Sequence, residues 1–373
     1  MTFNLKPTTF SFELECEFKE FPLAFVNSLR RVILTEIPTI AFNNIDYLNA
    51  DIKILENTSS LHNEFILERI SLVPIHIKNT DDFDPNNYTF KLDIENKTKN
   101  VINVTIKDIE VYDKTKNTLL TALDFFKPNP ITEEFITILK LHPNPNGKGE
   151  LIKMEGSPSK GIGKTHANYS PVSCVTFKNK RDPIKVEQAL QEYLDKHIKQ
   201  KNNKEELKQL SLDFELSLAD RYFMTDDDDE PNQFEFYIES KGVYTSKEIL
   251  SLGLKVLKQK INMFKDNVSK IVKNKETLEN VSIKESLDTM KSFDITVLKE
   301  SHTLGNIIQT YALKSNLEDL NFIGYKNPHP LKDFIIIKIS TKEHSMNELL
   351  SIIDITCDTI IKDIDIVSSS LSS

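Results

Sequence analysis

Hydrophobic and polar residues alternate from Phe10 to Phe18, which predicts a β-strand with one buried face. The period then changes to that of a helix, with apolar residues at Leu29, Val32, Ile33 and Ile37. Pro38 ends this predicted helix, because proline cannot continue one. The chain therefore opens with a strand followed by an amphipathic helix.

The middle of the chain, from residue 40 to residue 150, has the pattern of short strands. Residues 90–94 and 102–106 alternate on either side of the polar stretch 95–100, which predicts a hairpin. Residues 178–209 are charged and helix-prone, so we expect a solvated excursion there, with no function that we can assign.

A long amphipathic helix is predicted after Thr245, which has capping-box spacing to Glu248. Its apolar stripe runs through Ile249, Leu252, Val256, Leu257, Ile261, Phe264, Val268 and Ile271. Residues 274–291 are polar and are predicted to be a linker.

The last part of the chain repeats this order. Residues 293–297 alternate, residues 304–311 have helical spacing, an apolar strand lies near 334–336, and Ser345 and Glu348 cap a final helix. We therefore expect two related units, each made of a strand, a helix, a strand and a long helix. A large insertion interrupts the first.

Composition narrows the class of protein. The 373 residues carry 47 lysines and arginines and 56 aspartates and glutamates, a net charge of −9, and 39% of them are hydrophobic. The apolar content is enough for a core and argues against a disordered chain. The acidic balance disfavours a protein that grips nucleic acid with its own surface. Only nine residues are glycine, which disfavours glycine-rich phosphate-binding folds.

Cysteine usage and the N-terminus bear on location. Cys16, Cys174 and Cys357 lie far apart, so there is no disulfide framework or obvious zinc site in the sequence, and a reducing compartment is favoured. The N-terminus has no signal-peptide pattern, and no apolar run approaches the roughly 18 residues of a membrane span. We expect a soluble protein of the cell or virion interior, not a secreted or membrane protein.

Residues 161–165, GIGKT, have the ending of a phosphate-binding loop. The full motif needs a further glycine at the position of Pro158, and Gly156 lies two residues too early. A tight turn explains these residues better. A stand-alone nucleotide-binding enzyme that uses this loop is kept as the alternative function.

No other segment has the pattern of an active site. The acidic run 226–230 is typical of a solvated loop, because neighbouring carboxylates do not converge on a cation without a fold that holds them. The histidines are dispersed and form no metal-binding pair. We therefore predict no catalytic residue, no metal and no cofactor.

The first predicted helix carries Arg30 and Arg31, followed by Glu36, beside its apolar stripe. This pattern suits an ion-pair contact with another chain, because guanidinium groups bind carboxylates with two hydrogen bonds. The other interpretation is a surface helix with solvated arginines.

Six segments together resemble the alpha-like subunits of multisubunit DNA-directed RNA polymerases. Residues 25–41, FVNSLRRVILTEIPTIA, are similar to the signature helix of that family, and residues 57–75, 161–172 and 234–242 are similar to later motifs of its larger archaeal and eukaryotic member. Residues 300–306, ESHTLGN, and 324–331, GYKNPHPL, resemble the smaller partner. Both partners stand in one chain, the larger first, which resembles fusions in large DNA viruses of eukaryotes. The Asn-, Lys- and Ile-rich composition suits an AT-rich genome.

The resemblance implies an α+β fold: two alpha-subunit-type dimerisation units, each with antiparallel strands, one short and one long helix, that form an intramolecular pseudo-dimer, plus a strand-rich insertion. Residues 1–41 and 157–273 are then the larger unit, 42–156 the insertion, 274–291 the linker and 292–373 the smaller unit. No cysteine lies between Cys16 and Cys174, so the cysteine-rich metal-binding loop of some larger subunits is absent. The bacterial C-terminal DNA-binding module has no counterpart either.

The implied function is a non-catalytic assembly platform that docks the second-largest and largest polymerase subunits, with small accessory subunits as further partners. DNA contact is then only indirect, no membrane is involved, and the chain forms an internal pseudo-dimer rather than a homodimer. The expected location is the virion and host cytoplasm if the chain is viral, and otherwise the nucleus or cytoplasm. The subunit-interface residues implied by the resemblance are Asn27, Arg30, Arg31, Glu36, Pro38, His62, Glu64, Arg69, Pro74, His302, Leu304, Asn306, Tyr325, His329 and Pro330.

Overall fold

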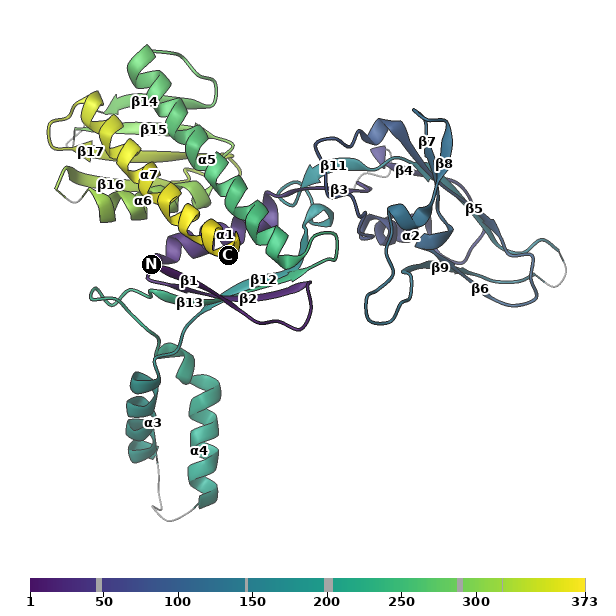
Figure 1. Ribbon diagram of the computed structural model, residues 1–373, viewed down its shortest axis with the longest axis horizontal. Coiled ribbons are helices and arrows are strands. Elements are labelled where there is room, and N and C mark those ends of the chain that lie inside the picture. The colour runs from purple at the N-terminus through teal and green to yellow at the C-terminus, as the bar shows by residue number, and fades with distance from the viewer. Residues whose placement is uncertain (45–48, 145–146, 198–203, 287–290, 317, 373) are drawn as a thin grey trace. The chain divides into compact units, whose positions relative to one another are not determined.

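The computed structural model describes residues 1–44, 49–144, 147–197, 204–286, 291–316 and 318–372 (Figure 1). They form two compact bodies. The core body comprises Met1–Val32, Cys174–Glu239 and Ser246–Ser373, and the insertion body comprises Ile33–Ser173 and Ser240–Thr245. The fold is α+β, and the paired strands of the described residues are antiparallel.

One sheet of the core body has the strand order β1-β2-β13-β12. Its strands are β1 (Thr2–Lys6), β2 (Glu13–Lys19), β12 (Val172–Asn179) and β13 (Gln233–Ser240). Alternation places Phe18 opposite Phe234 and Cys16 opposite Phe236 on the buried face. The predicted strand at 10–18 begins only at Glu13, because residues 10–12 form a bend in which the Phe10 and Phe12 rings stack.

Helices α1 (Leu23–Thr35) and α5 (Ser246–Asn274) were both expected from their apolar stripes. The rings of Phe18 and Phe25 lie 6.3 Å apart, so α1 packs on the buried face of the sheet. The apolar stripe of α5 is buried at Ile249, Leu257, Ile261, Phe264 and Val268.

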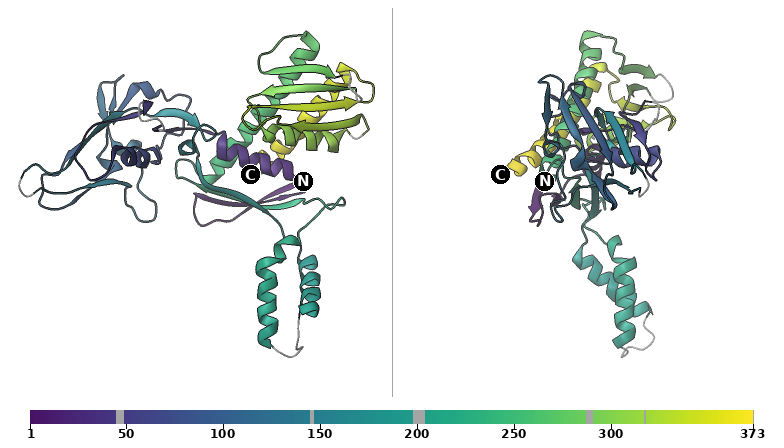
Figure 2. Two further views of the ribbon diagram at one scale, coloured as in Figure 1. Left: turned by 180° about the vertical axis from the view of Figure 1, so that it is seen from behind. Right: turned by 90° about the vertical axis from the view of Figure 1, so that its right-hand side faces the viewer.

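The second sheet of the core body has the order β14-β15-β17-β16. Its strands are β14 (Val281–Ser286), β15 (Ser292–Leu298), β16 (Leu320–Lys326) and β17 (Phe334–Thr341), and its helices are α6 (His302–Ser315) and α7 (Met346–Ser372). Helix α7 contacts α5 along its length, and both lie on one face of this sheet (Figures 1 and 2).

The predicted linker at 274–291 needs a correction, because β14 lies within it. Val281 pairs with Val297 and Ser286 with Ser292, so these residues extend the sheet. An edge strand buries only part of one face, and its apolar signal is therefore weak. The remaining connection between α5 and β14 is residues 275–280, and residues 287–290 lie outside the described residues.

The charged segment at 178–209 contributes to a helical hairpin within the core body. Helix α3 (Pro183–His197) and helix α4 (Lys204–Ser217) are followed by the short 3-10 turn η6 (Ala219–Arg221). Phe214 is the buried residue of the two helices, and its ring lies 5.5 Å from that of Tyr193.

The insertion body contains a sheet of order β4-β10-β5-β7-β8 and two-stranded sheets β11-β3 and β6-β9. Its elements are β3 (Pro38–Ala41), β4 (Ile52–Asn57), α2 (Asn63–Ser71), β5 (Tyr88–Glu95), β6 (Ile102–Thr105), β7 (Glu110–Asp113), β8 (Thr118–Leu120), β9 (Thr137–Leu141), β10 (Leu151–Gly156) and β11 (Ser159–Ile162). Short 3-10 turns are η2 (Pro85–Asn87), η3 (Ile106–Asp108), η4 (Ala122–Asp124) and η5 (Ala167–Tyr169). This body has its own apolar core, which includes Phe42, Phe90, Val111, Phe126 and Ile152.

The predicted boundaries of the insertion, 42 and 156, differ from those of the insertion body. Strand β3 precedes residue 42 and pairs with β11, which follows residue 156, so both pack with the insertion.

The predicted hairpin at 90–106 is wrong, because β5 pairs with β10 and β7 while β6 pairs with β9. The chain passes from one sheet to another between β5 and β6. The buried Asn96 side chain orders this connection, because it donates to Asn100 O and Leu141 O and accepts from Thr98 N.

A buried polar pair lies between α6 and α7. The Tyr311 hydroxyl donates to Asp363 Oδ2 over 2.6 Å, and both side chains are buried. Burial raises the pKa of Asp363, and the Tyr311 hydrogen bond and the N-terminal ammonium group offset this in part. A carboxyl group with a raised folded-state pKa stabilises the fold when protonated, and that contribution is lost as pH rises through the folded-state pKa.

We therefore expect Asp363→Asn to raise the free energy of unfolding at pH 7 by about 1 kcal/mol, because it keeps an acceptor for Tyr311 and removes a buried charge. The gain should shrink as pH falls toward the ordinary carboxyl pKa of 3.8. Urea unfolding between pH 4 and 8 measures it. Tyr311→Phe, which leaves the carboxylate without its donor, should destabilise at pH 7. An Asp363→Asn variant less stable than wild type at pH 7 would contradict this account.

Candidate subunit interface

Helix α1 presents the first group of predicted interface residues. Leu29 and Val32 are buried, so the side chains of Asn27, Arg30 and Arg31 lie on the opposite, half-buried side. Arg30 Nε and Nη2 donate to Asn27 Oδ1 over 3.2 and 3.1 Å, which is possible because residues three apart are neighbours on a helix.

Arg30 is a half-buried cation that has no carboxylate partner within the described part of the chain. Among the residues that the structure describes, no Asp or Glu lies within ion-pair distance of its guanidinium. Burial and the neighbouring Arg31 lower the pKa of Arg30, because both disfavour its charged form. A carboxylate from another chain would favour the charged form of Arg30 and so oppose this lowering of its pKa.

Arg31 connects α1 to the start of α6. Its Nε donates to Thr303 Oγ1 over 2.8 Å, and Ser28 Oγ donates to Thr303 O over 3.3 Å. Burial raises the pKa of Tyr325, and the charge of Arg31 opposes that shift. Arg31 therefore has a role inside the core body as well as near its surface.

His302 and Tyr325 lie next to this contact. Their rings are 5.7 Å apart, and His302 Nδ1 lies 3.3 Å from the Tyr325 hydroxyl. A Cβ on Gly305 would lie 2.3 Å from Tyr325 Cδ2, so only glycine permits this packing of the ring on α6. We call the surface formed by Asn27, Arg30, Arg31, His302 and Tyr325 the α1–α6 face.

Two other predicted residues of α6 have different environments. Asn306 is half-buried, whereas Leu304 is 1% exposed and lies in the core of the body. Leu304 therefore needs a correction: it positions α6 and presents no surface to another chain, since its helical spacing places it on the apolar stripe.

The loop after β16 holds His329 and Pro330, which are both exposed. Asn327 Oδ1 accepts from His329 N, and His329 Nδ1 accepts from Leu331 N over 3.1 Å, so the loop is ordered by its own side chains. Leu331 is 90% exposed at its tip. The sequence prediction omitted this leucine, although it lies inside the motif at 324–331.

The remaining predicted residues belong to the insertion body. Pro38 pairs with Ile162 in the β3–β11 ladder, Glu36 is half-buried just before it, and Pro74 is half-buried after α2. His62 is the residue before α2, and its backbone carbonyl accepts from Ile66 N.

Helix α2 exposes a mixed surface. Glu64 and Arg69, two of the predicted interface residues, are exposed, and Arg69 Nη2 donates to Thr137 O over 2.8 Å. Phe65 and Leu72 are 58% and 60% exposed on the same helix and its cap. Sequence reasoning missed both, and the available signal was that they depart from the buried stripe of Ile66, Leu67 and Ile70. We call Glu64, Phe65, Arg69 and Leu72 the α2 face.

The GIGKT segment is not built as a phosphate-binding loop. Gly161 lies in strand β11 opposite Thr39, and a Cβ on it would lie 2.6 Å from the Tyr169 ring. A Cβ on Gly163 would lie 2.4 Å from Leu34 O. The turn leads into the three-residue 3-10 turn η5 and not into the α-helix whose N-terminus holds a phosphate. Close packing explains these glycines.

The acidic run 226–230 forms a turn closed by its own first residue. Asp226 Oδ1 accepts from Asp228 N over 3.1 Å and from Glu230 N over 2.9 Å. In the described part of the chain, no group of three or more His, Cys, Asp or Glu side chains is arranged to hold a metal ion.

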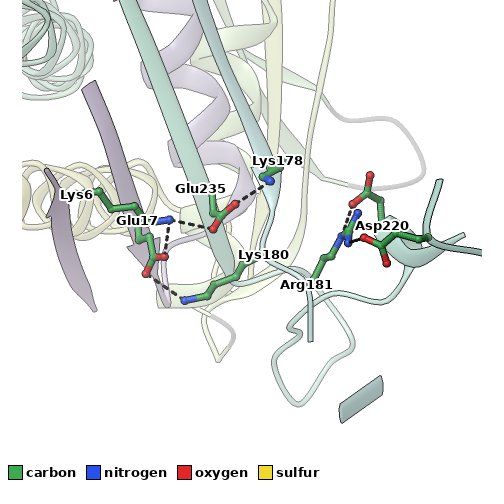
Figure 3. A network of polar contacts seen from close by, with 8 residues as sticks. Lys6, Glu17, Lys178, Lys180, Arg181, Asp220 and Glu235 are labelled. Carbon is green, nitrogen blue, oxygen red and sulfur yellow. Dashed lines mark hydrogen bonds and ion pairs between the residues drawn. The ribbon is translucent and has the colours of Figure 1, made fainter. Parts of the chain in front are cut away.

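A charged network covers the outer face of the first sheet (Figure 3). Glu17 and Glu235 lie opposite each other on β2 and β13, an unfavourable pair of like charges. Lys6 lies 3.0 Å from both, Lys178 binds Glu235 over 3.0 Å, and Lys180 binds Glu17 over 3.1 Å.

The lysines lower the pKa of both glutamates, so the network stays charged near neutral pH. The three lysines therefore compensate the repulsion between Glu17 and Glu235 on the paired strands β2 and β13. Arg181, next along the chain, binds Glu215 and Asp220 at the base of the α3–α4 hairpin (Figure 3).

Comparison with known proteins gives two matches to one family. The model of the RNA polymerase Rpb3/Rpb11 dimerisation domain matches residues 15–261, and a second model of the same domain matches residues 292–370. Within the described residues, no helix is both long and apolar enough to cross a membrane.

Three curated proteins illustrate the similarity. The conjugation stage-specific protein of Tetrahymena thermophila is 27% identical over 305 residues, which cover 69% of this chain and 92% of the relative. The subunit rpac1 of RNA polymerases I and III of Dictyostelium discoideum is 27% identical over 297 residues, 70% of this chain and 80% of the relative. Subunit 3 of RNA polymerases II, IV and V of Arabidopsis thaliana is 29% identical over 183 residues, 45% of this chain and 54% of the relative, so the chain spans about half of that protein.

Proposed function

The chain belongs to the family of the RNA polymerase Rpb3/Rpb11 dimerisation domain, and we propose that it is the platform on which the second-largest and largest subunits of a DNA-directed RNA polymerase assemble. It is a fusion of two alpha-like subunits, a structural component rather than an enzyme. The observation that carries the proposal is the presence of two such domains in one chain, the larger first.

The proposed pseudo-dimer is supported by contacts inside the core body. Helix α5, which precedes residue 275, packs on α7, and Arg31 and Ser28 bond to Thr303. Joining two partners in one chain makes their association intramolecular, so they meet at a high effective concentration. The platform then forms without a separate small subunit.

We propose the α1–α6 face and the α2 face as the surfaces that dock other subunits. Arg30 supports this, because it is half-buried and has no carboxylate among the described residues. Exposed Phe65, Leu72 and Leu331 support it too, since apolar anchors carry much of the energy of protein interfaces. The same platform takes small accessory subunits as further partners.

The net charge of −9 supports a role in which DNA is contacted only through the other polymerase subunits. The proposed location follows the polymerase, in the nucleus or cytoplasm. The proposed origin in a large DNA virus adds the virion and the host cytoplasm, and mass spectrometry of purified particles tests it.

For the domain division, we propose two dimerisation units, with 292–373 as the smaller one, preceded by β14. The larger unit is interrupted by the insertion, and the compact insertion body includes residues on both sides of 42–156.

The proposed function is tested by purifying the tagged chain from its native source. We expect the two largest polymerase subunits to co-purify in a constant ratio, and the eluted complex to synthesise RNA on a DNA template. The chain expressed alone should make no RNA. Recovery of the chain without any polymerase subunit would contradict the proposal.

A further inference from the structure

Helices α5 and α7 of the core body carry opposite charges. Helix α5 has seven lysines and two acidic residues, whereas α7 has five acidic residues and one lysine. Both helices are amphipathic, so their charged residues flank the apolar stripes that pack together. A charge difference of this size between two packed helices can decide which helices pair.

The charges meet in matched ion pairs. Lys258 Nζ lies 2.6 Å from Asp365 Oδ1, and Lys265 Nζ lies 2.6 Å from Asp358 Oδ1. Asp354 is a second, more distant partner of Lys265 at 3.9 Å. The earlier lysine pairs with the later aspartate, as antiparallel helices require.

A third lysine of α5 also pairs with an acidic residue from the later part of the chain. Lys260 Nζ lies 2.9 Å from Glu300 Oε2, just before α6, and both side chains are largely shielded from solvent. All three pairs join a lysine of α5 to an acid that follows residue 291. The charge pattern therefore distinguishes the two halves of the core body.

The spacing of the pairs makes the pattern selective. Lys258 and Lys265 are one heptad apart on α5, and Asp358 and Asp365 are one heptad apart on α7. The two lysines therefore occupy equivalent positions on α5, and the two aspartates occupy equivalent positions on α7. If α5 packed on α5 of a second copy in the same crossing, Lys258 would face Lys265 twice. If α7 packed on α7, Asp358 would face Asp365 twice. Only the unlike pairing is attractive at both contacts.

We propose that the Lys258–Asp365 and Lys265–Asp358 pairs specify the partner of α5. Helix α5 packs on a helix that carries acidic residues one heptad apart, and it does not pack on α5 of a second copy of the chain. This inference rests on the proposed intrachain pairing of the two units and adds its selectivity. Apolar burial supplies most of the stability of the contact, and the charges exclude the competing homotypic pair.

A charge-swap cycle in the full-length chain tests the proposal. One variant carries Lys258→Glu and Lys265→Glu, a second carries Asp358→Lys and Asp365→Lys, and a third combines all four changes. Each reversal should lower Tm by about 3–6 °C, because repulsion replaces attraction at two partly exposed sites. The combined variant should return to within about 2 °C of wild type. Added 1 M salt should shrink the losses, since it screens exposed pairs.

The matched control is Lys255→Glu with Lys270→Glu, which makes the same charge change at two exposed positions of α5. It should lower Tm by less than about 2 °C. A combined variant whose loss equals the sum of the two reversals would overturn the proposal. So would amine-reactive cross-links that join Lys258 of one wild-type copy to Lys265 of another. These measurements use the chain alone, so failure of the polymerase assignment would leave their result unaffected.

Discussion

Arg30→Glu is expected to abolish co-purification of the second-largest polymerase subunit while leaving the chain folded. Arg30 is half-buried, and its guanidinium donates to the neutral Asn27 side chain. A carboxylate supplied by the docking subunit would complete a bidentate ion pair, which is the geometry that guanidinium groups favour. Replacing that cation by an anion places two like charges together in a desolvated contact. Losses at such pairs are about 2–5 kcal/mol, which weakens binding by roughly thirty-fold or more.

The measurement is quantitative mass spectrometry of subunits recovered with the tagged variant from its native source. Lys19→Glu is the matched control, because Lys19 is exposed on β2 of the same body and the charge change is identical. It should retain the full complement of subunits. Arg30→Lys should retain part of it, since lysine keeps the charge but loses the second hydrogen bond.

Arg31→Glu separates docking from folding. Arg31 Nε bonds to Thr303 Oγ1, so reversal there removes a contact inside the core body and should also lower Tm. If Arg30→Glu kept wild-type recovery of the second-largest subunit and an unchanged Tm, the α1–α6 face would not be the docking surface.

The elements that could be predicted are those with one clearly buried face. Helices α1, α5 and α7 each present a continuous apolar stripe, so their period is evident from the sequence. Strands β1, β14 and β16 are among those that were missed. All three lie at sheet edges, where burial is partial and polar residues interrupt the alternation.

The candidate site was predictable in its local parts only. Asn27 and Arg30 are three residues apart, so a helix places them together whatever surrounds it. Arg31 and Thr303 are 272 residues apart, and their bond depends on how the halves of the core body pack. Leu304 was predicted to be an interface residue, but it is buried. It shares a motif with His302, yet its helical position turns it into the core.

Close backbone approaches are the features least visible in a sequence. In the sequence, Gly156 is notable only as a glycine two residues too early for a phosphate-binding loop. In the structure it lies in β10, where it pairs with Ile52 on one side and Phe90 on the other. A Cβ at this position would lie 1.9 Å from Asp51 O and 2.8 Å from Ile52 Cα. Both are main-chain atoms, so no side-chain rotation can relieve the clash.

Gly156→Ala is therefore expected to destabilise the insertion body by about 3 kcal/mol, because β4 and β10 must move apart. That movement disturbs the apolar core at Ile52, Phe90 and Met154. Hydrogen exchange of the β4 and β10 amides measures the effect directly, and their protection should fall by roughly a hundred-fold, the equilibrium equivalent of that loss. The amides of α5, in the core body, should keep theirs.

Gly147→Ala provides the matched control for Gly156→Ala. Among the described residues, a Cβ on Gly147 would approach only the Asn144 side chain, at 3.4 Å, so alanine fits there. Its effect should be neutral or slightly stabilising, because alanine reduces the freedom of the unfolded chain. Equal protection in the two variants would show that β10 can move without cost. A selective loss in Gly156→Ala should also weaken recovery of the largest subunits, because the α2 face depends on the same apolar core through Ile66, Leu67 and Ile70.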